Sequence, residues 1–291
     1  MKSKFIAYIV LLTLTVSVNV YYHWDKFWTI WAKQYVKDQD VVISLTTIPS
    51  RITELKSTLE CLSQQNLQPR QIFLNIPHKF KRKNEDYIIP NWLYTYPNLT
   101  ILRTEDYGPA TKLLGTLQQA DLTDDTIIIT VDDDTCYPSN LILRLTVRAK
   151  QYPQHAIGVS GVELNFAPDY PDGVSRVRLD QQYVSILEGF AGVAYRRYFF
   201  DSSVLKIIDE PNCCYNSDDL YLSFHLAKNN IPRHTLYNKF LSVRHIRQSN
   251  FGFGDDALYK LEQANRYATC IDHLQNKYPQ TVFINSHSVN Q

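Results

Sequence analysis

The chain has 291 residues, and its 30 Lys and Arg against 29 Asp and Glu give a formal net charge of +1. This balance excludes binding of nucleic acid through a strongly basic surface. Hydrophobic residues make up 44% and charged residues 20%, which excludes a disordered chain and allows a full hydrophobic core.

The first segment has the features of a membrane anchor. No residue between Lys4 and Asp25 is charged, and 5–20 is nearly all apolar. Twenty residues at about 1.5 Å of rise each can cross a hydrocarbon core of roughly 30 Å. A cleaved signal peptide is the alternative, but no clear small-residue cleavage site follows the apolar run. We therefore expect a signal-anchor, with a cytoplasmic tip and a transmembrane helix over 1–24.

Aromatic residues follow the anchor at helical spacing. Trp24, Trp28, Trp31 and Tyr35 fall on one side of a helix. Amphipathic rings at the end of a membrane span belong at the level of the lipid headgroups, although the same stripe can also pack on a globular domain. The sequence thus predicts a juxtamembrane amphipathic stem over 25–40.

Alternating strands and helices follow the stem. Short runs of β-branched and other apolar residues predict strands, and apolar residues three or four apart predict helices. The predicted strands cover 41–45, 71–76, 99–102, 126–131 and 156–162. Helices are predicted from the apolar pattern at 52–62 and through 112–117, and also over 141–152, 218–229 and 257–277. This order predicts one α/β domain over 41–291, with a mostly parallel sheet flanked by helices.

An acidic triplet ends the most strongly predicted strand. The run TIIITV at 126–131 leads directly into Asp132, Asp133 and Asp134. Ligands of such sheets bind beyond the carboxyl ends of the strands. Because side chains alternate along a strand, Asp132 and Asp134 share one face. Crowded carboxylates need a cation, and oxygen ligands suit Mg²⁺ or Mn²⁺, with a solvated acidic turn as the alternative.

Further charged residues open helices or crowd a loop. Asp218 and Asp219 start the helix predicted at 218–229, where the helix dipole keeps a carboxylate ionised, although simple N-capping also explains them. Lys112 opens another helix, either to meet phosphate or as a solvated lysine. The basic run 78–83 is either a solvated loop or a contact for an anionic acceptor or membrane headgroups.

These motifs together resemble the GT-A glycosyltransferases, the nucleotide-diphospho-sugar transferase fold, and its family 2-like members. The resemblance is carried, in order, by VVISLTTIPSR at 41–51, the aspartates 132–134 in the DxD position, EGFAGVAYR at 188–196 and NSDDLYL at 216–222. It covers roughly residues 41–247. Three aspartates in place of a DxD, and Asp218 where Glu is usual, depart from the family pattern.

The resemblance implies a membrane-anchored enzyme that moves a sugar from a nucleotide-diphospho-sugar to a hydroxyl of a glycan, lipid or protein acceptor. It also implies dependence on Mn²⁺ or Mg²⁺. Because the sequence offers a candidate base and no obvious second nucleophile, we expect inversion at the anomeric carbon. In a eukaryote the catalytic domain would lie in the Golgi lumen, and in a bacterium the anchor would lie in the inner membrane.

The same resemblance assigns roles to individual residues. Asp219 is the expected catalytic base, with Asp218 left open as an alternative. The metal ligands implied are Asp134, Asp132 and His245. For His245, the alternative is a structural histidine held by hydrogen bonds. The residues expected to bind substrate are Thr46, Pro49, Arg51, Lys112, Asp132, Asp133 and Gly192.

Two other functions fit parts of the sequence. A strand ending in Asp132-Asp133-Asp134 also suits haloacid-dehalogenase-like phosphatases, but that family expects the motif on its first strand, and three strands come first here. A non-catalytic carbohydrate-binding membrane protein would explain the 20 tyrosines but not two acidic sites.

The five cysteines favour no disulfide framework. They are odd in number, scattered, and without the CxxC spacing of zinc sites. We expect five reduced, partly buried thiols, although Cys213 or Cys214 can pair elsewhere in an oxidising compartment.

Overall fold

The computed structural model describes residue 24, residues 26–165, 183–236 and 265–283, and the strand backbone at 175–177 and 244–245. The chain divides into two compact units, Met1–Asp38 and Gln39–Gln291.

In the first unit, residues 26–35 form a helix, as the aromatic spacing predicts. Trp24, Phe27 and Trp31 are exposed, and Trp31 stacks on Tyr35 with ring centroids 5.1 Å apart. Within the described residues, every helix is too short or too polar to cross a bilayer. Of the anchor predicted over 1–24, residues 1–23 lie outside the described residues.

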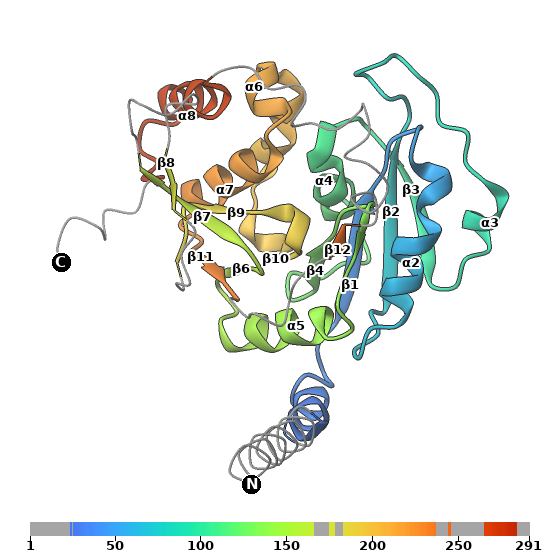
Figure 1. The fold of residues 1–291 in the computed structure, drawn as a ribbon. Helices are drawn as coiled ribbons and strands as arrows, with labels where there is room; N and C mark the ends of the chain where they lie inside the picture. Colours follow the sequence, from blue (N-terminus) through green and yellow to red (C-terminus); the bar gives the residue numbers. More distant parts are fainter. Residues whose placement is uncertain are drawn as a thin grey trace, which may run out of the picture. The chain divides into compact units, whose positions relative to one another are not determined.

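The second unit is built on a seven-stranded sheet with the order β11-β6-β10-β4-β1-β2-β3 (Figure 1). Its strands are β1 (Val41–Thr46), β2 (Gln71–Pro77), β3 (Leu99–Thr104), β4 (Ile127–Thr130), β6 (Ala156–Gly158), β10 (Val193–Arg196) and β11 (Arg233–Thr235). The pairs β4–β1, β1–β2, β2–β3 and β6–β11 are parallel, and β10 is antiparallel to both neighbours. The prediction of a mostly parallel α/β sheet is confirmed.

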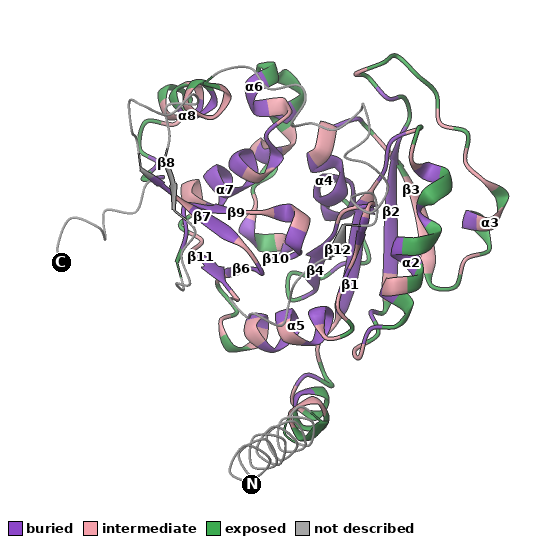
Figure 2. Cartoon of the chain, in the orientation of Figure 1, coloured by how far each residue is buried: buried purple, intermediate pink, exposed green. Residues whose placement is uncertain are grey.

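Helices cover both faces of this sheet, and a separate core lies under each. One core contains side chains of α4 (Thr111–Leu117) and α7 (Asp218–Lys228), together with Val42 from β1. The other contains those of α2 (Lys56–Ser63) and α5 (Leu141–Gln151), together with Ile43. Figure 2 shows the central strands buried along their length. Burial on both faces explains why these strands are continuous apolar runs in the sequence.

Smaller elements complete the unit. A second sheet has the order β8-β7-β9, and β12 pairs with β5. These strands are β5 (Thr135–Cys136), β7 (Gly161–Asn165), β8 (Ser175–Val177), β9 (Ile186–Leu187) and β12 (Arg244–His245). The other helices are α3 (Asn91–Tyr94), α6 (Asn212–Tyr215) and α8 (Arg266–Lys277), with 3₁₀ turns η1 (Ile52–Glu54), η2 (Gly108–Ala110), η3 (Gly189–Ala191), η4 (Arg197–Phe199) and η5 (Ser202–Asp209).

Three predicted elements differ from the structure. The strand predicted at 156–162 is divided between β6 and β7, which belong to different sheets. A Cβ on Gly161 would lie 2.8 Å from the Ile186 carbonyl oxygen, so the chain at this point runs against β9. The helix pattern of 52–62 is a 3₁₀ turn followed by α2. Of the predicted helix 257–277, residues 266–277 are helical and 257–264 lie outside the described residues.

The prediction of five reduced thiols is wrong. Cys61 is bonded to Cys136, and Cys214 to Cys270, while Cys213 is buried and free. The partners are 75 and 56 residues apart in the sequence, so the fold alone brings them together. One disulfide fixes the chain just after the acidic triplet, and the other fixes α6, just before the acidic pair.

Candidate active site

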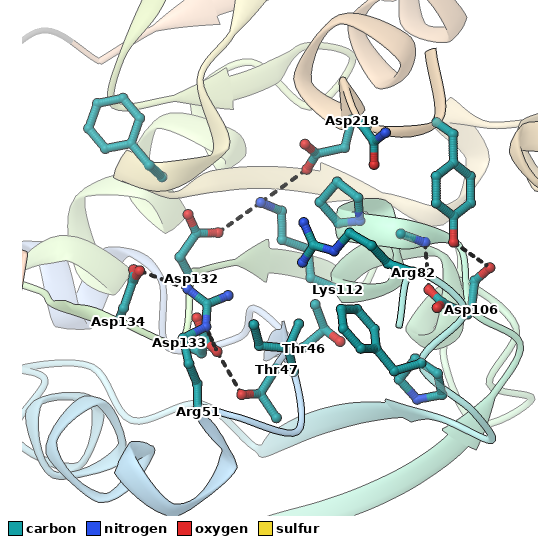
Figure 3. Close-up of a pocket in the computed structure, with 18 of the residues that line it drawn as sticks. Thr46, Thr47, Arg51, Arg82, Asp106, Lys112, Asp132, Asp133, Asp134 and Asp218 are labelled. Atoms are coloured by element: carbon teal, nitrogen blue, oxygen red, sulfur yellow. Dashed lines mark hydrogen bonds and ion pairs between the residues drawn. The ribbon is translucent and has the colours of Figure 1, made fainter. Parts of the chain in front are cut away.

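A cavity of about 370 Å³ opens at the carboxyl ends of β1, β2 and β4, the edge at which open α/β sheets bind ligands. Figure 3 shows the side chains that converge there. The residues that line it are Thr46, Thr47, Ile48, Arg51, Pro77, Phe80, Arg82, Tyr87, Asp106, Gly108, Pro109, Lys112, Asp132, Asp133, Asp134, Phe190, Tyr215, Asn216, Asp218 and Asp219. The acidic triplet and the acidic pair, more than 80 residues apart in the sequence, therefore share one cavity.

The three aspartates of the triplet have different surroundings. Asp133 is buried, accepts a hydrogen bond of 2.6 Å from the Thr47 hydroxyl and lies 3.1 Å from Nε of Arg51. Burial raises the pKa of Asp133 to about 6, against the lowering influence of Arg51. Asp132 and Asp134 are only half-buried. Asp133 thus anchors the turn, and its two neighbours face the cavity.

Arg51 holds two aspartates of the triplet at once. Its Nη1 donates to Oδ2 of Asp134 over 2.9 Å, in addition to the contact with Asp133. The 3₁₀ turn η1 follows Arg51 directly and fixes its backbone close to the end of β1. The Thr58 hydroxyl of α2 also donates to the Asp133 carbonyl over 2.8 Å. The loop after β1 and the turn after β4 therefore form one hydrogen-bonded unit.

Lys112 lies between the two acidic motifs. Its buried ammonium is 2.8 Å from Asp132 Oδ1 and 3.1 Å from Asp218 Oδ2. Burial alone would lower the pKa of Lys112, but Asp132, Asp218 and Asp219 outweigh it and raise the pKa well above the usual value. This lysine is charged at neutral pH and neutralises part of both motifs.

A buried polar network fixes the helix that carries Lys112. The Ser44 hydroxyl donates to the Lys112 carbonyl oxygen and contacts the Thr116 hydroxyl. Asn75 donates to the hydroxyls of both Ser44 and Thr116 over 3.0 Å. These bonds hold α4 against β1 and β2. The backbone that carries the Lys112 side chain is therefore fixed at the edge of the sheet.

The acidic pair begins α7, as predicted. Asp218 is buried beside Lys112, whereas Asp219 is half-buried and accepts a 2.9 Å hydrogen bond from the Gly189 backbone N–H. Burial and the neighbouring Asp218 raise the pKa of Asp219 well above its usual value, although Lys112 opposes this shift. A carboxylate with a raised pKa is a stronger proton acceptor, which suits Asp219 to take a proton.

Gly189 lies close to the side-chain ends of Asp219 and Lys112. A Cβ there would lie 2.7 Å from Asp219 Oδ1 and 2.9 Å from Lys112 Nζ. The sequence singled out Gly192 instead. That residue does not line the cavity; it has a φ of +99°, a conformation that favours glycine, and ends η3 before β10.

Tyr137 connects the two halves of the site through its buried hydroxyl. The hydroxyl accepts a 2.8 Å hydrogen bond from the Asp132 backbone N–H and donates one of 2.9 Å to the Phe190 carbonyl. The turn that holds Asp132 is therefore tied to the turn that holds Asp219 through Gly189. Sequence reasoning missed Tyr137 because nothing local distinguishes it from other core tyrosines.

Aromatic and apolar side chains form another wall of the cavity. Phe80, Tyr87 and Pro77 line it, and the Tyr87 hydroxyl donates to the Thr47 carbonyl over 2.9 Å. Asp106, after β3, accepts backbone hydrogen bonds from Lys81 and Gly108 and so closes the loop around this wall. Such a wall can stack a planar ring, beside charged groups that can meet phosphates.

The predicted site residues are mostly brought together. Those that line the cavity are Thr46, Arg51, Lys112, Asp132, Asp133, Asp134, Asp218 and Asp219. Pro49 and Gly192 do not line it. Thr47, Asp106 and Gly189 were missed, although each lies next to or inside a segment that the sequence indicated.

Asp132 and Asp134 could hold a divalent cation that takes its other ligands from outside the protein. Asp132 and Asp134 present carboxylate oxygens at the cavity wall, and Mg²⁺ is commonly held by one or two carboxylates plus phosphate oxygens. Within the described ranges, no group of three or more His, Cys, Asp or Glu side chains is placed to hold a metal ion. The backbone of His245 pairs with Thr135, one residue after Asp134, and its side chain lies outside the described part.

Comparison with protein-family models gives no match for this chain, and comparison with curated proteins gives none either. The function is therefore argued from the geometry of the cavity.

Proposed function

We propose that this chain is a glycosyltransferase of the GT-A type that moves a sugar from a nucleotide-diphospho-sugar to an acceptor hydroxyl, with inversion. One observation carries the proposal. The acidic triplet after β4 and the acidic pair at the start of α7 line the same cavity, with Lys112 between them. A transferase of this type needs one acidic group beside the diphosphate and another beside the acceptor.

The residues of the cavity divide by function. Phe80 and Tyr87 provide a flat wall for a nucleobase, beside the polar ends of β1 and β2. Lys112 and Arg51 supply positive charge where the diphosphate develops negative charge as the sugar departs. Asp132 and Asp134 would hold Mn²⁺ or Mg²⁺, and the bound ion would stabilise the leaving diphosphate.

The acceptor side needs a base. Asp219 takes the proton of the acceptor hydroxyl, the oxygen forms a bond to the anomeric carbon, and the bond from that carbon to the phosphate oxygen breaks. The electron pair leaves with the nucleoside diphosphate. Because attack occurs on the face opposite the leaving group, the configuration inverts. The raised pKa of Asp219 favours it over Asp218, which is paired with Lys112.

The same geometry weighs against a phosphatase of the haloacid-dehalogenase type. In such an enzyme the second acidic pair follows a strand, whereas Asp218 and Asp219 begin a helix directly after α6.

The helix over 26–35 follows an uncharged apolar segment and has exposed aromatic side chains, which supports attachment to a membrane surface.

The test is a donor screen with variants. Full-length protein is given a panel of nucleotide sugars with Mn²⁺, and release of nucleoside diphosphate is measured. Asp134→Ala should abolish release and metal-dependent nucleotide binding. Asp219→Asn should lower turnover by about 10² to 10⁴ while donor binding persists. Asp124→Ala, an exposed aspartate before β4, is the matched control. Full activity of Asp134→Ala would refute the metal role, and loss only in Asp218→Asn would move the base to that residue.

A further inference from the structure

A second cavity, of about 530 Å³, adjoins the first. It is lined by Lys81, Arg82, Ile208, Glu210, Asn212, Tyr215, Asn216 and Arg266. Three of these residues, Arg82, Tyr215 and Asn216, also line the first cavity, so the two form one continuous surface. Asn216 lies two residues before Asp218, which places the second cavity on the side of the acidic pair.

The lining of the second cavity carries an excess of positive charge. Lys81, Arg82 and Arg266 face one acidic lining residue, Glu210. The carboxylate of Glu210 is already held by Lys277 and by His273, each over 2.6 Å. The charge of Glu210 is therefore already balanced by residues outside the lining.

Two of the cations are placed to bind something else. The Nη1 atom of Arg266 is buried and has no hydrogen-bond partner among the described residues. A buried guanidinium N–H without an acceptor is costly, which points to an anionic or carbonyl oxygen as its ligand. Lys81 is half-exposed, with Nζ 3.7 Å from Glu105 and 3.4 Å from the Asp106 carbonyl oxygen, contacts loose enough to exchange.

We propose that the second cavity binds an anionic group of the acceptor, a phosphate, sulfate or carboxylate, through Lys81, Arg82 and Arg266. The inference rests on the proposed function, because the acceptor is identified by its closeness to Asp219. The first cavity is lined by six aspartates against three basic residues, so an acidic acceptor needs further cations beside that cavity. When the anionic group of such an acceptor binds in the second cavity, the acceptor hydroxyl is positioned at Asp219.

The binding test uses inorganic phosphate as the probe. It is titrated calorimetrically into full-length protein, the double variant Lys81→Gln/Arg266→Gln, and Lys79→Gln. The charge-assisted hydrogen bonds of one cation are worth roughly tenfold in affinity, so the double variant should bind phosphate at least tenfold more weakly. Lys79 belongs to the same basic run, is exposed and lines neither cavity, so its variant should bind within about twofold of wild type, the scale of a surface charge. Equal affinity of the double variant and wild type would overturn the proposal.

The transfer test compares a neutral glycoside, its phosphate ester and the matching uronic acid as acceptors. The anionic acceptors should have a KM at least roughly tenfold lower, and the double variant should erase this advantage. An advantage for one anion alone names the group that binds. Equal KM values for all three acceptors would refute the inference while the transferase stands. If no nucleotide sugar is bound or cleaved, the transferase fails, and the phosphate titration still decides the anion site. Thermal unfolding of each variant confirms that it is folded.

Discussion

Replacing Lys112 by Met removes the cation that two acidic motifs share. At an effective dielectric constant of about 20, the contacts of 2.8 Å with Asp132 and 3.1 Å with Asp218 are worth about 6 and about 5 kcal/mol. Desolvation of the buried ions offsets much of this attraction. Removal of one partner of a buried pair typically costs about 3 to 5 kcal/mol, and we expect Lys112→Met to lower the free energy of unfolding by that amount at pH 8.

The loss should depend on pH with a defined sign. In wild type, the raised pKa of Lys112 keeps its contribution intact through neutral pH, and it declines only above the usual range of lysine. In the variant, the carboxylates that faced Lys112 lose their cation, so burial favours their neutral form. They can be protonated at low pH, and each pH unit above about 4 adds up to about 1.4 kcal/mol per carboxylate. The cost should therefore be smaller at pH 5 than at pH 8.

The measurement is urea unfolding of the full-length protein, followed by circular dichroism at pH 5 and pH 8. Lys228→Met is the control, because Lys228 forms a 2.6 Å ion pair with the half-exposed Asp201. A partly exposed pair of this kind is worth less than about 1 kcal/mol and should show a much smaller difference between the two pH values than Lys112→Met. A cost below about 1 kcal/mol for Lys112→Met at pH 8, or an equal cost at both pH values, would refute the reasoning.

Three further changes test the supports of the site. Tyr137→Phe leaves a buried N–H without its acceptor, so urea unfolding should show a loss of about 1 to 3 kcal/mol, and no loss would mean that the hydroxyl ties nothing together. Gly189→Ala puts a Cβ 2.7 Å from Asp219 Oδ1 and should lower nucleoside diphosphate release more than about tenfold, whereas unchanged release would show that this contact can relax. Cys214→Ser with Cys270→Ser opens a loop of 56 residues and should lower the free energy of unfolding by about 4 kcal/mol; reductant should cause a larger loss in wild type, because it also opens the Cys61–Cys136 bond.

The central strands were predictable because their signal is local. A strand buried on both faces must be apolar at every position, and 41–45 and 126–131 show this directly. The place of the site follows from the same signal, because polar residues after such strands collect at one edge of the sheet. Asp132, Asp134 and Arg51 were therefore found without knowledge of any contact between them.

The antiparallel strand β10 could not be found in this way. It lies between β4 and β6, two strands that precede it in the chain, and its position depends on pairing with residues more than 30 positions away. The same limit applies to Gly189. The sequence marked a segment with two glycines, but only the approach of Asp219 and Lys112 shows which of them lies against the acidic pair.

The disulfides show the limit of spacing as evidence. Cys61 and Cys136 lie 75 residues apart, and each has an ordinary amphipathic or turn context. They meet because α2 packs beside β5, a contact set by the order of strands. The order of strands cannot be predicted from the composition of the chain or from the spacing of its cysteines.

The aspartates within each acidic motif have different contacts, and Lys112 contacts one aspartate of each motif. Asp133 is buried and held by Thr47 and Arg51, which leaves Asp132 and Asp134 as the half-buried carboxylates of the triplet. In the pair, Asp218 lies against Lys112, which leaves Asp219 with its single backbone donor. Lys112 thus takes one carboxylate from each motif and fixes the distance between them. A change in its charge is felt on both sides of the cavity, and substitutions on the two sides should be non-additive whenever Lys112 is removed.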